Sequence, residues 1–416
     1  MKILIVTYSD TQGGAAKALF RIASGLRLLG HDARMLVAAK GSDAAFVETP
    51  AGVCRNGWAA VRRYLARAVI AIATGSRAGD RSLGIFAGGL ADAINTSDAD
   101  VVMLGWVGEE TLSIAEIAGI RKPLLWRFSD MWPITGTEHY VDAAAFSRYT
   151  TAGAAASDVA GDLDGRVFRR KRKQWQIAPT AITPSRWLAD CISASAIAAR
   201  WPLRVIPTPV DVELYRPQDR QAARRSLGLP PNRRILIFSA LHADSDPRKG
   251  WDLLAGALQR LDPAEVSCIV VGRHPGAAPI EYPLPVIDIG LVNDELRMAA
   301  LYAAADVAVL PSRLDNLPQA GLEAQACGCP VVAFDSGGMR DLVDHGVSGL
   351  LATPFDIDDF ASAISAIIAD PARQAALSVA ARQRALALWS PAVTIPGFVA
   401  AFEETRRRYE AMRGTY

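Results

Sequence analysis

The stretch AVLPSRLDNLPQAGLEAQACGCPVVAFDSGG, residues 308–338, decides the fold. It opens with an apolar, β-branched run that is typical of a buried parallel strand. Pro318 predicts the start of a helix over 319–326, because the N–H that proline lacks has no partner in the first turn, and Gly328 predicts its end. A second apolar run at 330–334 predicts another strand, which a Gly-Gly turn follows. This order of strand, loop, helix and strand is typical of a parallel α/β sheet.

Two acids of this stretch, Asp315 on the predicted loop and Glu323 on the predicted helix, are separated by seven residues. A helix N-terminus at the carboxyl edge of a parallel sheet offers free N–H groups and a favourable dipole to a phosphate. A carboxylate one turn further along can accept hydrogen bonds from a ribose diol. From spacing alone, Asp315 is equally a solvated loop acid and Glu323 an ordinary surface acid.

The segment resembles the E-x7-E segment of the retaining, GT-B-fold glycosyltransferases of family 4, with Asp315 where the first acid is usually Glu. The resemblance implies that Glu323 binds the ribose of a nucleotide. It also implies that Asp315, Asn316 and Leu317 lie beside the donor sugar and its diphosphate. Because aspartate is one methylene shorter than glutamate, Asp315 keeps the charge and changes the reach.

Composition limits the class of protein. A chain of 416 residues predicts two domains, and with half of its residues apolar it can bury a large core. The 45 basic and 43 acidic residues nearly cancel, so nothing global favours nucleic acid as a partner. Five cysteines without C-x-x-C spacing predict a reducing compartment with neither a disulfide framework nor a zinc site. We interpret Cys327 and Cys329 as packing residues.

The opening MKILIVTYS predicts a first strand rather than a signal peptide. We expect that no apolar run approaches the ~20 residues of a membrane span. We therefore expect a cytoplasmic protein that contacts membrane, if at all, only at its surface.

A strand, a glycine-rich loop, a helix and a second strand are predicted in succession over residues 3–38, an opening that is Rossmann-like. The dinucleotide fingerprint G-x-G-x-x-G is missing, which disfavours a dehydrogenase. Gly13 and Gly14 let the backbone approach a substrate closely, or they form a plain tight turn. In the resembled family an N-terminal Gly-Gly loop borders the cleft near diphosphate and acceptor, which implies that Gly13 and Gly14 contact the donor.

Two segments are candidates for contact with an anionic membrane. Residues 58–72 place their apolar members on one face of a predicted helix: Trp58, Val61, Leu65, Ala68, Val69 and Ile72. Arg62 and Arg63 fall largely off that face, a pattern that suits an interfacial helix and also an ordinary helix packed on the domain core. The basic run RVFRRKRKQW, 166–175, predicts a solvated helix face. The alternative is a juxtamembrane patch through Arg169–Lys173, or a site for a pyrophosphate-bearing acceptor.

The segment SDMWPITGTEHY, residues 129–140, follows a predicted strand, where α/β folds place their chemistry. It resembles the His-Asp-Met-Trp-Pro-x-Thr-Gly…His-Tyr loop of the polysaccharide-assembly branch of the family, of exopolysaccharide and colanic-acid type. Ser129 stands where that branch has a histidine near the reacting centre. The remaining titratable candidates are Asp130, which either contacts an acceptor hydroxyl or caps the next turn, and His139, which is either structural or catalytic.

A second alternation of strands and helices begins at Arg234. Arg248 and Lys249 stand at a loop–helix boundary and either clamp a diphosphate or are two ordinary exposed bases; the resemblance to the family's Arg-Lys-Gly segment favours the clamp. The resemblance also implies that Leu291 and Val292 line the nucleobase pocket. Further along, Pro391 and Pro396 are expected to interrupt the helical pattern.

We therefore expect an α/β protein of GT-B fold, in which two Rossmann-like domains with parallel sheets face each other across a cleft. The predicted acceptor domain spans 1–205, the donor domain spans 206–388, and a last helix within 389–416 crosses back to the first domain. The resemblance implies a retaining glycosyltransferase that moves a hexosyl-type group from a UDP- or GDP-sugar to a saccharide or lipid-linked acceptor in cell-surface polysaccharide assembly. Catalytic candidates are Asp130, His139 and Asp315.

The nucleotide sugar is a substrate, and neither a metal nor another cofactor is expected. Two other classes stay open. One is a different GT-B enzyme, such as a sugar-nucleotide epimerase or a natural-product glycosyltransferase. The other is a non-catalytic nucleotide-sugar-binding protein.

Overall fold

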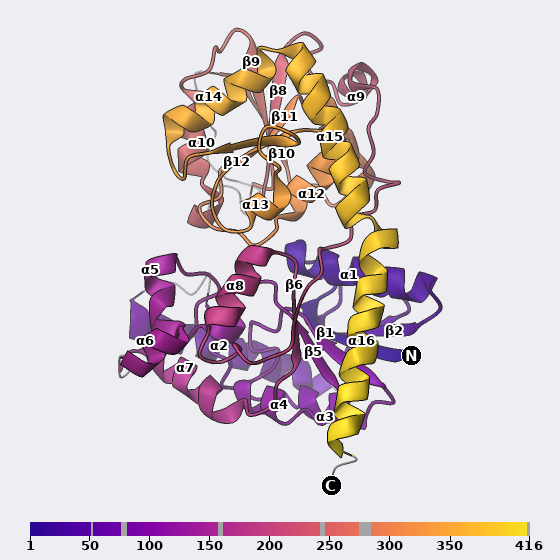
Figure 1. Cartoon of the computed structure of the whole chain (residues 1–416), viewed down its shortest axis with the longest axis vertical. Helices are drawn as coiled ribbons and strands as arrows, with labels where there is room; N and C mark the ends of the chain where they lie inside the picture. Colours follow the sequence, from indigo (N-terminus) through magenta and orange to yellow (C-terminus); the bar gives the residue numbers. More distant parts are fainter. Residues whose placement is uncertain (51–52, 76–80, 157–160, 242–245, 274–283, 414–416) are drawn as a thin grey trace. The chain divides into compact units, whose positions relative to one another are not determined.

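The computed structural model of the chain describes residues 1–50, 53–75, 81–156, 161–241, 246–273 and 284–413 (Figure 1). The chain divides into two compact units. Unit 1 comprises Met1–Pro207 and Ile395–Tyr416, and unit 2 comprises Thr208–Thr394. The sequence-based boundaries of 205/206 and 388/389 precede these divisions by two and six residues.

Unit 1 is built on a parallel sheet with strand order β3-β2-β1-β4-β5-β6-β7 over the described residues. Its strands are β1 (Lys2–Ser9), β2 (Asp32–Ala39), β3 (Val47–Glu48), β4 (Val101–Leu104), β5 (Leu124–Arg127), β6 (Thr180–Thr183) and β7 (Leu203–Val205). Its helices are α1 (Gly13–Leu28), α2 (Val53–Thr74), α3 (Leu90–Thr96), α4 (Ile114–Ala118), α5 (Ala143–Phe146), α6 (Thr151–Ala156), α7 (Leu163–Gln174), α8 (Arg186–Ala194) and most of α16 (Pro391–Arg413), with the short 3₁₀ helices η1 (Trp132–Ile134) and η2 (Ser147–Tyr149).

Unit 2 is built on a second parallel sheet, with strand order β10-β9-β8-β11-β12-β13. Its strands are β8 (Arg234–Ser239), β9 (Val266–Val271), β10 (Val286–Gly290), β11 (Val307–Leu310), β12 (Val331–Phe334) and β13 (Gly349–Ala352). Its helices are α9 (Arg220–Ser226), α10 (Trp251–Leu258), α11 (Glu295–Ala304), α12 (Gln319–Ala326), α13 (Met339–Leu342), α14 (Ile357–Ile368) and α15 (Pro371–Trp389), with η3 (Pro247–Lys249). The predicted α/β class, with two Rossmann-like units, is confirmed.

Both sheets are covered on both faces. In β4, Val102 and Leu104 belong to one buried cluster, and Val101 and Met103 belong to another. Because successive side chains of a strand point to opposite faces, a continuous apolar run fills two cores at once. The strands of unit 2 follow the same rule.

The last helix returns to the first unit, where Figure 1 shows α16 in yellow. Its side chains Ile395, Phe398 and Phe402 are buried in the cluster on one face of the unit 1 sheet. The expectation that prolines interrupt this segment is wrong in part, since α16 begins at Pro391 and Pro396 lies inside it. Pro391 suits the first turn, where no N–H is needed, and burial of the following apolar side chains offsets the bond lost at Pro396.

Among the described residues, the stretch Pro371–Arg413 contains a run that is long and apolar enough to cross a membrane, judged by length and composition. The expectation that no run approaches this length is wrong by that measure. The stretch forms two helices, α15 and α16, with Ser390 as a non-helical residue between them. Leu377 and Trp389 of α15 are buried in unit 2, and Phe398 of α16 is buried in unit 1. We therefore attribute the apolar composition to core packing.

Helix α2 contradicts the alternative in which its apolar face packs on the domain core. Arg62 is buried and donates to the carbonyl oxygens of Phe86, at 3.1 Å, and Glu110, at 2.7 Å. Arg63 donates to the Tyr8 hydroxyl at 3.0 Å. The prediction that Arg62 and Arg63 contact a membrane is thus wrong for Arg62, which is buried against the protein, and Arg63 is held to Tyr8. The apolar face that was expected to pack on the core is instead exposed.

Candidate active site

In unit 2, three loops at the carboxyl edge of the sheet meet around Asp315. Its carboxylate accepts a hydrogen bond from Lys249 Nζ at 2.6 Å and another from the Asn316 N–H at 3.0 Å. Burial alone raises the pKa of Asp315, but the nearby Lys249 and Arg248 outweigh burial and hold that pKa below its ordinary value. Asp315 is therefore a buried carboxylate paired with a cation, and the alternative of a solvated loop acid is wrong.

Arg248 lies beside Lys249 on η3. Its guanidinium forms an ion pair with Asp246 at 2.7 Å, and Asp246 also accepts the Arg248 N–H, so that one acid both caps η3 and orients the arginine. The Arg248 carbonyl in turn accepts the Arg313 N–H at 2.8 Å, which joins this segment to the loop after β11. The two cations are therefore oriented by acids, unlike ordinary exposed bases.

Two glycines permit the close approach of these loops. Gly250 has φ +69°, and a Cβ there would lie 1.9 Å from the Pro311 carbonyl oxygen. Gly337 has φ +58°, and a Cβ there would lie 2.5 Å from the Asp315 carbonyl oxygen, which accepts the Gly338 N–H. Both positions combine a left-handed backbone with a backbone neighbour, so only glycine fits without movement.

The predicted helix over 319–326 is confirmed as α12, with identical bounds. Its N-cap residue is Pro318, which forms no side-chain capping bond. Asn316, Leu317 and Glu323 are all buried, which excludes Glu323 as an ordinary surface acid. Tyr302 lies near Glu323: burial, followed by the Glu323 charge, raises the pKa of the Tyr302 phenol.

Leu291 and Val292 follow β10 at the same edge of the sheet. Strand β9 separates β10 from β8, so these two residues lie further along that edge than Lys249. Leu291 is exposed, whereas Val292 packs partly on the core. The Gly272 N–H donates to the Gly290 carbonyl at 2.8 Å and holds the β9 and β10 ends together.

In unit 1, Asp130 and His139 form a buried pair. His139 Nδ1 lies 2.5 Å from Asp130 Oδ2, and Trp106 Nε1 donates to the same oxygen at 2.8 Å. The other Asp130 oxygen accepts the Trp132 N–H at 3.0 Å, so the turn-capping role considered for Asp130 is confirmed. Because a carboxylate only accepts hydrogen bonds, Nδ1 of His139 carries the proton.

The other ring nitrogen of His139 contacts Ser82, a residue that sequence analysis did not identify. His139 Nε2 lies 2.8 Å from Ser82 Oγ, which also accepts the Glu109 N–H at 3.1 Å. The Ser82 hydroxyl can therefore donate its own proton to Nε2. Glu109 and Glu110 have φ of +53° and +55°, two successive strained residues that present Glu110 to three N–H groups of the 84–86 segment.

The segment 129–140 was predicted to be a polar loop, but it is mostly buried. Lys171 of α7 explains how its backbone is satisfied. Its Nζ donates to the carbonyl oxygens of Trp132, Thr135 (3.2 Å) and Gly136 (2.7 Å), and lies 3.9 Å from the centroid of the Trp132 ring. The basic run on α7 is thus not uniformly solvated, since Lys171 is fully buried.

A second group of charges fixes the other end of this segment. Asp164 accepts from Arg81 Nη1 at 2.8 Å and from the Thr137 N–H at 3.1 Å. Glu138 accepts from the Tyr149 hydroxyl at 2.8 Å, and burial raises the pKa of Glu138. The segment is therefore held by side chains from both sides.

Ser129 occupies the position at which the resembled branch has histidine. Arg127 Nη1 donates to Ser129 Oγ at 3.3 Å, and burial lowers the pKa of Arg127 to about 10. A guanidinium thus lies next to the position where the branch has an imidazole.

Gly13 is the first residue of α1 and has φ +82°, a conformation that favours glycine, and Gly14 follows it as an exposed residue. Asp10, just before them, accepts the N–H groups of Gly41 (2.7 Å) and Ser42 (3.0 Å) and so fixes the loop. A tight turn and a substrate-facing loop are both consistent with this geometry.

The structure thus brings the predicted residues together in two groups. Arg248, Lys249, Asp315, Asn316 and Leu317 form the group in unit 2, with Glu323 on the helix that follows. Asp130 and His139 form the group in unit 1. In the described part of the chain, no cluster of three or more His, Cys, Asp or Glu side chains could hold a metal ion.

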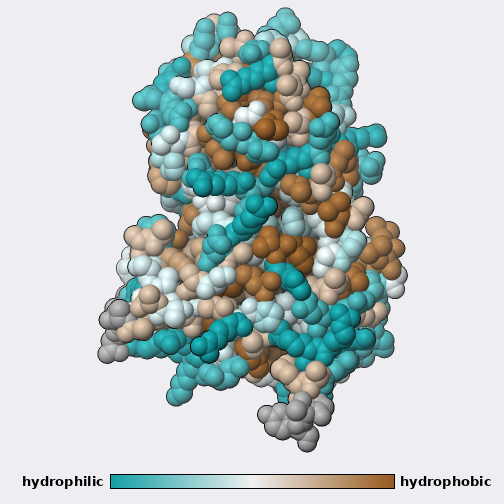
Figure 2. All heavy atoms as spheres, in the orientation of Figure 1, coloured by the Kyte–Doolittle hydropathy of each residue, from teal (hydrophilic) through white to brown (hydrophobic). Residues whose placement is uncertain are grey.

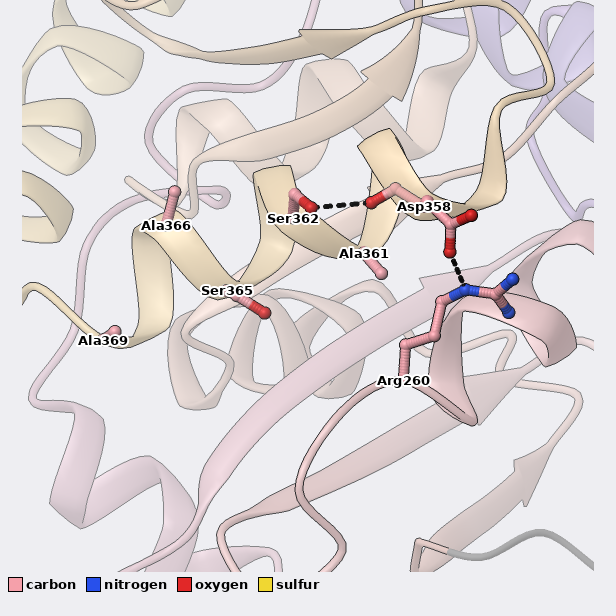
Figure 3. Close-up of a pocket in the computed structure, with 7 residues that line it drawn as sticks. All are labelled: Arg260, Asp358, Ala361, Ser362, Ser365, Ala366 and Ala369. Carbon is pink, nitrogen blue, oxygen red and sulfur yellow. Dashed lines mark hydrogen bonds and ion pairs between the residues drawn. The ribbon is translucent and has the colours of Figure 1, made fainter.

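A hollow of about 550 Å³ lies elsewhere in unit 2, along α14 (Figure 3). It is lined by small side chains such as Ala361 and Ser365, and its cation, Arg260, is ion-paired with Asp358. It contains no convergent set of polar groups and shares no lining residue with the Asp315 cluster. We assign no chemistry to it.

Some site residues could have been found in the sequence. Phe168, Lys171 and Trp175 recur at spacings of three and four, so Lys171 stands on the apolar face of an otherwise basic helix. No local pattern in the sequence identifies Ser82 and Trp106 as site residues, because they are 57 and 33 residues away from His139, which they contact.

Comparison with known proteins agrees with the fold. Residues 232–370 match the sequence family described as glycosyl transferases group 1. The chain is 39% identical over 221 residues to a D-inositol 3-phosphate glycosyltransferase of Geodermatophilus obscurus, covering 48% of each chain. It is 29% identical over 262 residues to one of Nocardia farcinica, covering 59% of this chain and 56% of the other. The chain spans about half the length of the curated relatives it matches.

Solved structures match over nearly the whole chain. Anabaena HepE in complex with UDP and glucose aligns with a TM-score of 0.64 at 20% identity, covering 97% of this chain and 99% of the other. The sucrose-phosphate synthase of Thermosynechococcus elongatus aligns with a TM-score of 0.64 at 18% identity, covering 100% and 99%. WaaG, a glycosyltransferase involved in lipopolysaccharide biosynthesis, aligns with a TM-score of 0.60 at 16% identity, covering 96% and 98%. At these identities the likeness shows the fold, which is GT-B.

Proposed function

We propose that this protein is a glycosyltransferase that takes a sugar from a nucleotide-diphosphate sugar and transfers it with retained anomeric configuration. The Lys249–Asp315 pair at 2.6 Å, with Arg248 beside it at the carboxyl edge of the unit 2 sheet, carries the proposal. The match of residues 232–370 to glycosyl transferases group 1 covers this cluster and supports it.

Arg248 and Lys249 suit the leaving diphosphate. A guanidinium offers a fork of donors, and an ammonium offers a point charge, to the phosphate oxygens. The N–H groups that open α12 face the same edge and favour an anion. Charge that develops on the leaving group is thereby neutralised without an obligatory metal, by electrostatic stabilisation. Glu323, buried on α12, is assigned to the ribose of the nucleotide.

The acceptor is assigned to unit 1. Asp130 and His139 form a buried hydrogen-bonded pair there. We propose that Asp130 orients the acceptor through His139 and the 129–140 backbone, and that attack occurs on the face from which the diphosphate leaves. No side chain is assigned as a covalent nucleophile.

The acceptor class has two candidates. The 129–140 segment favours a saccharide or lipid-linked acceptor in cell-surface polysaccharide assembly. The curated relatives carry the name D-inositol 3-phosphate glycosyltransferase and favour a phosphorylated polyol instead. A cytoplasmic location, on the side where nucleotide sugars are made, accompanies either acceptor.

A thermal-shift panel of UDP, GDP, ADP and their sugars, with magnesium or with EDTA, tests the donor site. A ligand at ~100 times its dissociation constant adds about 2.7 kcal/mol of stability. We expect one nucleotide to shift the melting temperature and the shift to fall in Glu323→Gln, an isosteric change. Turnover with each acceptor, followed by the anomeric configuration of the product, then tests transfer.

Other outcomes contradict the proposal. Release of free nucleotide with an altered sugar and no acceptor identifies an epimerase. Tight nucleotide-sugar binding without turnover on any acceptor class identifies a binding protein. A flat panel refutes the donor site.

A further inference from the structure

Helix α2 exposes an apolar surface that no part of the described chain covers fully. We call this surface the α2 apolar stripe, and it comprises Trp58, Val61, Tyr64, Leu65, Val69 and Ile72. Ile72 is 86% exposed, Tyr64 is 74% exposed, and Trp58 is 47% exposed. Single exposed apolar side chains are normal, but six on one helix mark an interaction surface.

The opposite face of α2 fixes this orientation. Arg62 donates to two backbone carbonyls, and Nη2 of Arg67 donates to both carboxylate oxygens of Glu109, at 2.8 and 2.9 Å. Ala66 and Ile70 are buried on the same side. Rotating α2 to bury its apolar stripe would break these bonds and bring arginines to the surface that now carries the stripe. The protein therefore holds the stripe outward.

The chemistry of the neighbouring surface points to the occupant. Helix α7 contacts α2, and its outer side exposes Arg166, Arg172 and Lys173. Figure 2 shows hydrophilic residues gathered over the lower left of unit 1, where Figure 1 places α7. An exposed apolar stripe, with exposed cations on the helix that contacts it, is complementary to a bilayer that contains anionic lipids, because acyl chains receive the stripe and headgroups receive the cations.

A second copy of the chain fits this surface less well. Trp58, Val61, Leu65 and Ile72 follow a heptad seam, but Tyr64 and Val69 widen it beyond the two positions per heptad that a coiled coil buries. Pairing two copies would also bring two cationic α7 helices near each other. Tyr64, which is 74% exposed, combines an apolar ring with a hydroxyl, which suits the boundary between acyl chains and water.

We propose that the α2 apolar stripe inserts into the surface of an anionic bilayer, with the exposed cations of α7 against the headgroups. The proposal does not depend on the reaction assigned above. The part of α2 that contacts lipid in this proposal is its apolar stripe, and not Arg62, which is buried.

Co-sedimentation of the full chain with vesicles tests the proposal. Vesicles of phosphatidylcholine alone are compared with vesicles that also contain phosphatidylglycerol, at low and high salt. We expect binding to the anionic vesicles that weakens as salt rises. Val61→Ser/Ile72→Ser should lower the partition coefficient by about tenfold or more. Leu28→Ser, at a residue of α1 that is 87% exposed, is the matched control and should leave the partition coefficient unchanged.

A separate pair of changes tests the electrostatic part. Arg172→Gln/Lys173→Gln should weaken binding to anionic vesicles and reduce its salt dependence. Circular dichroism and the melting temperature establish that each variant is folded. Equal binding to both vesicle types, or binding that Val61→Ser/Ile72→Ser leaves intact, overturns the proposal. A lipid-independent dimer that Ile72→Ser dissociates, without vesicle binding, also overturns it and assigns the stripe to a second copy.

Discussion

The buried ammonium of Lys171 holds the backbone of the 129–140 segment, so its removal should loosen that segment. Lys171→Met keeps most of the side-chain volume and removes the three donors to Trp132, Thr135 and Gly136. Each buried carbonyl left without a donor costs about 1–3 kcal/mol. Because the variant also avoids the desolvation cost of a buried charge, we expect the lower end of the sum, about 3 kcal/mol.

Amide hydrogen exchange measures the loss of stability within the 129–140 segment itself. Met131 and Ile134 donate their N–H groups within the segment, to His139 and Met131 respectively, so their exchange reports its opening. A loss of about 3 kcal/mol should speed their exchange by about 100-fold under conditions of local opening. Lys173→Met, an exposed residue two positions along α7, is the control and should leave exchange unchanged.

The result also bears on catalysis. Lys171 contacts no substrate in this scheme and acts through the segment that carries Asp130 and His139, so it is a positioning residue. We expect Lys171→Met to lower kcat more than it raises the KM for the donor, which we assign to unit 2. Exchange at Met131 that changes less than about threefold would refute the reasoning that Lys171 holds this segment.

Three further predictions concern unit 2. Lys249→Met leaves Asp315 buried without its cation and should cost about 3 kcal/mol at neutral pH. In this variant the pKa of Asp315, which Lys249 and Arg248 hold below 3.8 in the unchanged protein, should rise. The loss of unfolding free energy, measured with urea, should therefore shrink as the pH falls through the range in which carboxylates are protonated. A loss that does not depend on pH contradicts this. Gly346→Ala places a side chain at a left-handed φ with no close neighbour, so it should lower the free energy of unfolding by about 1 kcal/mol. In Gly337→Ala the added Cβ also meets the Asp315 carbonyl oxygen, so the free energy of unfolding, measured by thermal unfolding, should fall by at least about 1 kcal/mol more. Equal losses in the two variants contradict the close approach. The Arg248→Ala/Lys249→Ala pair should lower turnover by ~10²–10³, and near-normal turnover contradicts the clamp.

Much of the fold could be predicted because its signals are local. Helix α12 was predicted with the bounds it has, because Pro318 and Gly328 mark its two ends within the stretch itself. In this segment, propensity and packing favour the same structure.

The orientation of side chains could not be predicted where it depends on distant backbone. Arg62 is buried because carbonyls 24 and 48 residues away accept its hydrogen bonds, and no periodicity within α2 indicates that. Of the two sequence-based alternatives for the apolar side of α2, packing on the core is not found, and Arg62 does not face outward as expected. The partners of His139 and Lys171 are long-range in the same sense. Several site residues named from motifs, such as Asp130 and Asp315, lie on loops that follow strands, and Glu323 lies on the next helix, so the order of elements along the chain fixes their positions.

The division of the chain has a consequence for its synthesis. The residues of α16 that complete the core of unit 1 follow the whole of unit 2 in the sequence. A ribosome therefore finishes unit 2 while the face of the first sheet that α1 and α16 share is covered by α1 alone, and the part that receives Phe398 and Phe402 is still exposed. Domains generally fold as they are made, N-terminal first, but here the N-terminal unit has to wait for the C-terminal one. During that interval the nascent chain presents an apolar sheet face, and a chaperone that holds it there would act on unit 1 rather than on unit 2.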